Sequence, residues 1–223
     1  MTAPQTKPAP AETRERLLAA AERIFAREGI SRTSVRQITT EAGVNVAAVN
    51  YHFGSREGLI EAIFELHASD VNAERIRALD AVLSAAGDKP PQLSGILEAY
   101  LSAPLERLAR REGEEAPFGQ LVSRLFHEPP EVVEPLMRRH FLPTTERFLD
   151  AIAAALPELP RVDVEFRFRL VVASLAATAS RKRGPNWLPT TEPRNTAMDP
   201  KEDMQRLTAF LTGGLRAPAG VPS

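Results

Sequence analysis

The chain contains no cysteine among its 223 residues. This absence excludes disulfide bonds, thiolate metal sites and cysteine nucleophiles, and it suits a reducing compartment. Long apolar runs are lacking too, because the richest segment, 170–179, is far shorter than the roughly 20 residues that span a bilayer. The first ten residues hold no apolar segment, so we expect no signal peptide and a cytoplasmic protein.

A strong net charge of either sign is also missing. Lys and Arg number 28 against 29 Asp and Glu, which gives a formal net charge of −1. Residues 1–60 carry eight basic and six acidic side chains, so the N-terminal part is slightly basic. This balance excludes indiscriminate binding to nucleic acid but permits a local basic surface.

Motifs that carry common enzyme chemistry are absent as well. The sequence has no G-x-S-x-G, no phosphate-binding loop, no G-x-G-x-x-G and no metalloprotease His-Glu motif. His127 and His140 have no partner at metal-ligand spacing, so we expect no metal and no cofactor. The pair Glu114–Glu115 lies in a segment flanked by glycine and proline and is typical of a solvated loop.

Helical periodicity dominates what is present. Apolar residues recur at helical spacing in segment after segment, as at Leu17, Ala21, Ile24 and Phe25. Segment 162–168 alternates like a strand, but its continuation through Val171 and Leu175 favours a helix. The sequence therefore predicts an all-α protein. The expected helices are 13–28, 34–42, 45–52, 55–85, 93–111, 118–127, 131–156, 162–183 and 202–211.

Proline, glycine and charge divide the chain into four parts. Residues 1–11 are rich in Pro and Ala and are expected to be a disordered arm. A small helical domain over 12–57 precedes a larger helical domain over 58–215, and 216–223 is expected to be a disordered tail. Proline residues inside helical patterns predict kinks or breaks at Pro104, Pro135 and Pro143.

Two short helices around Gly43 form the pattern with the clearest functional meaning. The first begins near Ser34 and the second at Asn45, both good N-cap residues. Two short helices joined by a glycine-containing turn are typical of a helix-turn-helix, whose second helix enters the DNA major groove. Short helical hairpins also occur without this function, so the pattern alone leaves both readings open.

The residues around this turn make the pattern more specific. Segment 13–64 resembles the DNA-binding domain of the tetracycline-repressor (TetR) family. The matching features are Ala20-Ala21, Phe25, Gly29, Thr33-Ser34-Val35, Ile38, Glu41-Ala42-Gly43-Val44, Tyr51-His52-Phe53 and Ser55-Arg56-Glu57-Gly58-Leu59. The sequence departs from the family at 46–48, where Val-Ala-Ala replaces the frequent Lys or Gly-Thr. A helical enzyme or an adaptor without DNA binding is the alternative.

The resemblance, together with side-chain chemistry, identifies candidate DNA contacts. Asn can read adenine, Tyr hydroxyls and Arg commonly bind phosphate, and Ala can only meet thymine methyls. Asn45 also fits a purely capping role, Tyr51 a half-buried aromatic and Arg36 a solvated charge. The expected DNA-binding residues are Thr33, Ser34, Arg36, Asn45, Val46, Ala47, Ala48, Asn50, Tyr51, His52 and Arg56.

For the larger domain, the resemblance implies dimerisation and effector binding. Helices 162–183 and 202–211 correspond to the pair that forms the homodimer interface. A dimer would bind an inverted-repeat operator as a repressor and release it when a small molecule binds. Bias toward Phe and Leu predicts an apolar or acyl-bearing effector, although each side chain also fits plain core. The candidates are Tyr100, Leu101, Phe118, Leu121, Arg124, Leu125, Phe141, Phe148 and Phe168, with His127 and His140 as polar anchors.

Overall fold

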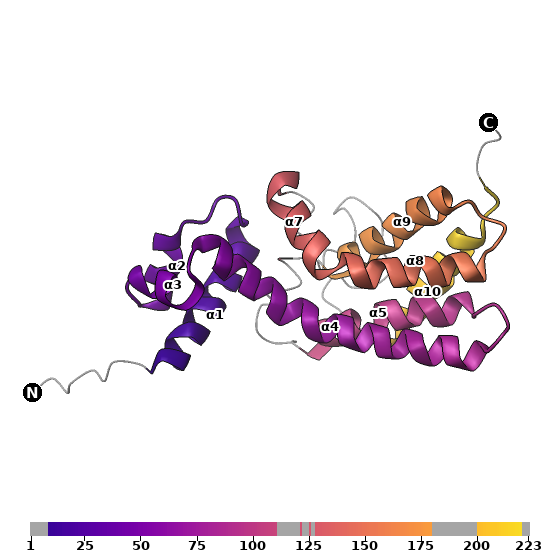
Figure 1. The fold of residues 1–223 in the computed structure, drawn as a ribbon, viewed down its shortest axis with the longest axis horizontal. Coiled ribbons are helices and arrows are strands. Elements are labelled where there is room, and N and C mark those ends of the chain that lie inside the picture. Colours follow the sequence, from indigo (N-terminus) through magenta and orange to yellow (C-terminus); the bar gives the residue numbers. More distant parts are fainter. Residues whose placement is uncertain (1–8, 111–120, 122–124, 126–127, 180–199, 220–223) are drawn as a thin grey trace, which may run out of the picture.

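The computed structural model describes residues 9–110, 121, 125, 128–179 and 200–219. Within these residues every regular element is a helix, which confirms the all-α prediction. Figure 1 shows an elongated molecule with α1–α3 at one end, a helical bundle at the other, and α4 running between them. The helices are α1 Pro10–Glu28, α2 Val35–Ala42, α3 Ala47–Phe53, α4 Arg56–Ala86, α5 Leu93–Arg110, α7 Pro130–His140, α8 Leu142–Ala155, α9 Arg161–Ala179 and α10 Pro200–Arg216.

Helix α1 begins earlier than its sequence suggested. It starts at Pro10, not after Thr13, so the last two residues of the expected arm 1–11 are helical. Proline suits the first helical position because its fixed φ is helical and its missing N–H has no partner to lose there. The hydroxyl of Thr13 donates to the carbonyl of Ala9 instead of capping the helix, at 3.2 Å.

The buried side chains form two separate cores. The first core joins α1–α3 to the beginning of α4 and also contains Leu121 and Leu136. The second core lies among α5, α8, α9 and α10 and the later turns of α4, with Leu79 and Phe148 fully buried. Helix α4 contributes to both cores, and its 31 residues correspond to about 46 Å of continuous rod.

Proline sets the limits of the helices in the second half. The expected helix 131–156 is divided at Phe141, and Pro143 lies in the first turn of α8, so the predicted break is confirmed there. Pro135 and Pro104 lie inside α7 and α5. Segment 162–168 belongs to α9, as the helical interpretation predicted.

The C-terminal segment is more ordered than expected. Helix α10 extends to Arg216, and the guanidinium of Arg167 donates to the carbonyls of Leu215, Ala217 and Pro218. The beginning of the expected tail 216–223 is therefore held against α9. In the part of the chain that the structure describes, no helix is long and apolar enough to cross a membrane.

Candidate DNA-binding site and ligand-binding core

The turn between α2 and α3 is set by local backbone chemistry. Ser34 and Gln37 form a capping box at the start of α2, in which each side chain bonds the other residue's backbone N–H. Gly43 ends the helix at φ 65°, a left-handed conformation that favours glycine. The guanidinium of Arg16 on α1 donates to the carbonyl of Ala42 at 2.6 Å. Together these contacts fix the direction in which α3 leaves the turn.

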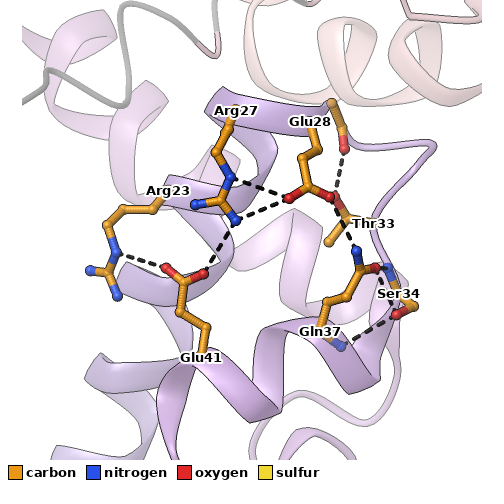
Figure 2. Close-up of polar contacts among 8 residues, drawn as sticks. Arg23, Arg27, Glu28, Thr33, Ser34, Gln37 and Glu41 are labelled. Atoms are coloured by element: carbon orange, nitrogen blue, oxygen red, sulfur yellow. Dashed lines mark hydrogen bonds and ion pairs between the residues drawn. The ribbon is translucent and has the colours of Figure 1, made fainter.

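A polar network braces α1 against α2 (Figure 2). Glu41 accepts from Arg23 at 3.0 Å and from Arg27 at 3.5 Å, so its negative charge is neutralised from two sides. Arg27 also bonds Glu28, and this hydrogen bond raises the pKa of Arg27. The amide nitrogen of Gln37 donates to Glu28 at 3.1 Å. Gln37 and Glu41 are four residues apart, so these contacts hold α2 on α1 through one side of α2.

Helix α3 presents one face to solvent and the other to the first core. Val49 is 1% exposed, whereas Tyr51 is 78% and Val46 is 48% exposed. Ala47 and Asn50 are exposed on the same side, at the spacing of one helical turn from Tyr51 and Val46. Ala48 is half-buried and packs against the core, so it offers less to a partner than Ala47 does.

Four predicted contact residues have structural duties of their own. The hydroxyl of Thr33 is buried and donates to the carbonyl of Gly29 at 2.7 Å, which leaves no side-chain donor for DNA. Arg56 donates to the carbonyls of Thr33 and Ile30 and thereby ties the loop before α2 to the start of α4. Ser34 serves the capping box described above, and the side-chain oxygen of Asn45 accepts from the backbone N–H of Ala47 at 2.9 Å.

His52 and Arg36 lie at the edges of the exposed face. His52 is half-buried between the rings of Tyr51 and Phe53, with ring centroids 4.8 Å and 6.2 Å away. Arg36 is exposed on α2, and no ion pair joins it to another residue of the described ranges. The exposed residues of this face are therefore Val46, Ala47, Asn50 and Tyr51, and Arg36, Ser34 and Asn45 are exposed as well.

Glu128 connects this domain to the rest of the molecule, and the sequence provided no signal for it. Its carboxylate accepts from the backbone N–H of Ile30 at 2.7 Å and of Ser31 at 3.0 Å, and from the hydroxyl of Ser31. Gly29 allows this approach, because a Cβ at that position would collide with the carboxylate. Glu128, two residues before α7, thus caps the loop between α1 and α2, 97 positions away in the chain.

Helix α7 is also joined to α4 by charge. Arg139 bonds Glu61 at 2.6 Å, and the ring of His140 contacts both Glu61 and Glu65. The amide nitrogen of Asn72 donates to the carbonyl of His140 at 2.6 Å. His140, expected as an anchor for an effector, is therefore engaged in holding α7 on α4.

The predicted effector residues fall into two groups. Tyr100 meets Phe148 and Phe168 edge to face, with centroids 5.1 Å and 4.9 Å apart, and Leu101 lies in the same second core. Leu121, Leu125 and Phe141 belong instead to the first core, with α1–α3 and the beginning of α4. Phe118, Arg124 and His127 lie outside the described residues.

Arg75 lies beside the aromatic group and was missed from the sequence. It is 4% exposed on α4, and its guanidinium carbon lies 3.8 Å from the ring centroid of Tyr100. Its Nε donates to the carbonyl of Tyr100 at 2.9 Å. In an α-helix that carbonyl would accept from residue 104, but Pro104 has no N–H. The only sequence signal for this contact is the proline inside the helix.

Comparison with known proteins identifies the family. The model "Tetracyclin repressor-like, C-terminal domain" matches residues 98–214, and the model "Bacterial regulatory proteins, tetR family" matches residues 17–63. This chain belongs to the TetR family. The resemblance of segment 13–64 is thereby confirmed and extends into the larger domain. A curated relative is the HTH-type transcriptional repressor BepR of Brucella suis biovar 1 (strain 1330), 31% identical over 51% of each chain. The alignment thus spans about half the length of that repressor.

Solved structures have the same fold as this TetR-family chain. A mutant of HlyIIR superposes with a TM-score of 0.61 at 18% identity, over 93% of this chain and 99% of that one. NalD, the secondary repressor of the MexAB-OprM multidrug efflux pump in Pseudomonas aeruginosa, superposes with a TM-score of 0.57 at 19% identity. That match covers 95% of this chain and 100% of NalD.

Proposed function

We propose that this chain is a cytoplasmic, homodimeric transcriptional repressor that binds an inverted-repeat operator and releases it when a small molecule binds. The observation that carries the proposal is the exposed face of α3. A tyrosine that is 78% exposed on a short helix contributes nothing to the core, while Val49 on the opposite side anchors that helix. Family membership and the helix-turn-helix geometry around Gly43 support the same conclusion.

In this proposal Asn50 and Val46 face base edges, and Tyr51 and Arg36 bind phosphates. Asn offers a donor and an acceptor that match adenine, and Val and Ala suit thymine methyls. Because the polar groups are few, phosphate contacts and DNA shape would supply much of the affinity. Ser34, Asn45, Thr33 and Arg56 would act chiefly by shaping the site, through the caps and carbonyl contacts described above, and His52 through its ring contacts.

A dimer follows from the small size of this surface, since one short helix offers few contacts and paired half-sites double them. Helices α9 and α10 carry apolar side chains suited to that interface. Val162, Phe166 and Leu170 are each more than half exposed at i, i+4 and i+8, and Phe210 on α10 is 74% exposed. We infer that a second copy covers this face.

The proposal is tested with a duplex carrying the inverted repeat nearest to the protein's own gene. Fluorescence anisotropy should give tight binding that weakens steeply with salt, and much weaker binding to a scrambled duplex. Equal affinity for both duplexes, or no binding to either, contradicts the proposal and favours a helical enzyme or adaptor.

Variants of Tyr51 test the exposed face of α3 in the same assay. Tyr51→Phe removes only the hydroxyl and should weaken operator binding about 10- to 150-fold per half-site, because a hydrogen bond to a charged phosphate contributes roughly 1.5–3 kcal/mol. Tyr51→Ala should weaken it at least as much and leave the dimer intact. Leu66→Ala, at an exposed position on α4, is the control. Wild-type affinity of both Tyr51 variants would remove this residue from the site.

A further inference from the structure

Arg75 stands out in the second core because it is a cation among apolar side chains. Among the residues whose burial the structure describes, no other Lys or Arg is buried. No carboxylate of those residues forms an ion pair with it, and burial lowers the pKa of its guanidinium. Arginine still remains protonated in proteins. An unpaired buried charge is costly, so its retention calls for a compensating contact.

The contacts within the fold use only part of this side chain. Nε serves the carbonyl of Tyr100, which Pro104 leaves without a helical donor. The guanidinium also lies over the Tyr100 ring, a cation–π contact that offsets part of the charge. One donor would satisfy that carbonyl, whereas the two terminal nitrogens carry four more N–H groups.

The unused donors of Arg75 are not fully enclosed by the fold. The two terminal nitrogens form no hydrogen bond to another described residue. They are not among the fully buried polar atoms that lack a partner, so part of their surface is exposed to solvent. The small exposed area of Arg75 therefore lies at the end of the guanidinium. The hydroxyl of Tyr100 likewise forms no hydrogen bond to another described residue and is not fully buried. One turn earlier on α4, the side-chain oxygen of Asn72 is buried and has no partner among the described residues.

We propose that Arg75 and the hydroxyl of Tyr100 bind the carboxylate of an effector whose apolar body packs beside the second core. The guanidinium fork matches a carboxylate, and a single cation balances one negative charge better than the two of a phosphate. Tyr100, Phe148 and Phe168 supply the neighbouring apolar surface. This inference rests on the proposed function, because it assigns the chemical class of the molecule that releases DNA.

The test separates the role of Arg75 in the fold from its role in binding. Pro104→Ala restores a backbone N–H that can donate to the carbonyl of Tyr100. The double variant Arg75→Met with Pro104→Ala can therefore keep this carbonyl hydrogen-bonded without the cation. Pro104→Ala alone is the control. Benzoate and dodecanoate are titrated against the full chain, each beside its neutral counterpart, benzamide or dodecanol, with inorganic phosphate as a third anion. Thermal unfolding and calorimetry report binding.

At least one carboxylate should raise the melting temperature of the wild type and of Pro104→Ala more than its neutral counterpart does. The double variant should remain folded and bind that carboxylate about 10- to 100-fold more weakly, as expected for lost charge-assisted hydrogen bonds. The inference is overturned if neither carboxylate raises the melting temperature more than its neutral counterpart, or if phosphate binds more tightly than both carboxylates. It is also overturned if the preference for the carboxylate over the neutral compound persists in the double variant, or if Pro104→Ala alone abolishes that preference. Binding to the operator duplex is measured on the same samples, so a regulator that ignores carboxylates is distinguished from a protein that does not bind DNA.

Discussion

At the scale of single residues, the loop before α2 is held by two charged side chains from opposite sides. Arg56 from α4 donates to the carbonyls of Ile30 and Thr33, while Glu128 accepts from the N–H groups of Ile30 and Ser31. The donors and acceptors of one short loop are therefore satisfied by different parts of the chain. This arrangement makes the loop sensitive to any movement of the segment before α7.

Glu128→Ala should loosen this loop. Removing a carboxylate that accepts three hydrogen bonds leaves two backbone N–H groups without their partner, and we expect a loss of about 1–3 kcal/mol in the free energy of unfolding. Chemical denaturation measures it, and amide exchange at Ile30 and Ser31 should accelerate. Glu131→Ala, at an exposed carboxylate on α7, is the control. Equal free energies of unfolding of the two variants would show that the contact of Glu128 with this loop does not stabilise the fold.

At the scale of elements, α3 is positioned by its junction with α4. Ser55 caps α4 by accepting from the N–H of Gly58 at 3.0 Å. Gly58 has no side chain, and a Cβ there would overlap the carbonyl oxygen of Phe53, the last residue of α3. The two helices can meet at this angle only because position 58 is glycine.

Gly58→Ala should therefore destabilise the small domain and displace α3. Overpacking of this kind costs about 1–3 kcal/mol, and here the obstructing atom belongs to the backbone and cannot rotate away. Operator affinity and the urea midpoint should both fall. Gly95→Ala in α5 is a matched helical control, because its Cβ would meet the methyls of Val82 at an ordinary 3.4 Å. Similar behaviour of the two variants would refute the role assigned to Gly58.

Sequence reasoning was most accurate for features determined locally. Apolar periodicity and Gly43 marked the first three helices, because a helix face and a left-handed turn depend on neighbouring residues. The start of α1 was misplaced because a proline at the first position can begin a helix that Thr13 also suits. The contacts of Arg75 and Glu128 could not be predicted, since each depends on a segment far away in the chain.

The candidate sites followed the same division. Exposure of Asn50 and Tyr51 on α3 follows from helical spacing around the buried Val49. The effector residues were chosen by residue type alone, and type does not reveal which core a side chain joins. Tyr100 and Phe141 therefore appeared equivalent in the sequence but lie in different cores.

At the scale of the whole molecule, the exposed apolar face of α9 is the feature left to explain. Leu170 is 52% exposed on α9, and Leu66 is 53% exposed on α4. The two leucines are thus matched in type and exposure but lie on different surfaces. Only the first belongs to the proposed dimer interface.

Leu170→Glu should shift the protein from dimer to monomer, because it places a charge in a surface that the second copy would bury. Leu66→Glu should leave the dimer intact. Light scattering coupled to size-exclusion chromatography measures both masses at the same concentration. Loss of the dimer should also weaken operator binding, since the paired half-sites would no longer be bound together. A dimeric Leu170→Glu would place the interface elsewhere.

The division into two cores has a consequence for how the sequence can evolve. Residues that pack α1–α3 and residues around Tyr100 belong to different clusters, which share little beyond α4 and the contacts of α7. Substitutions can accumulate in one cluster while the other keeps its packing, because distant sites contribute nearly independently to stability. If the proposed function holds, a new effector specificity can therefore arise without redesign of the proposed DNA-binding end, provided that α4 and α7 continue to fit both.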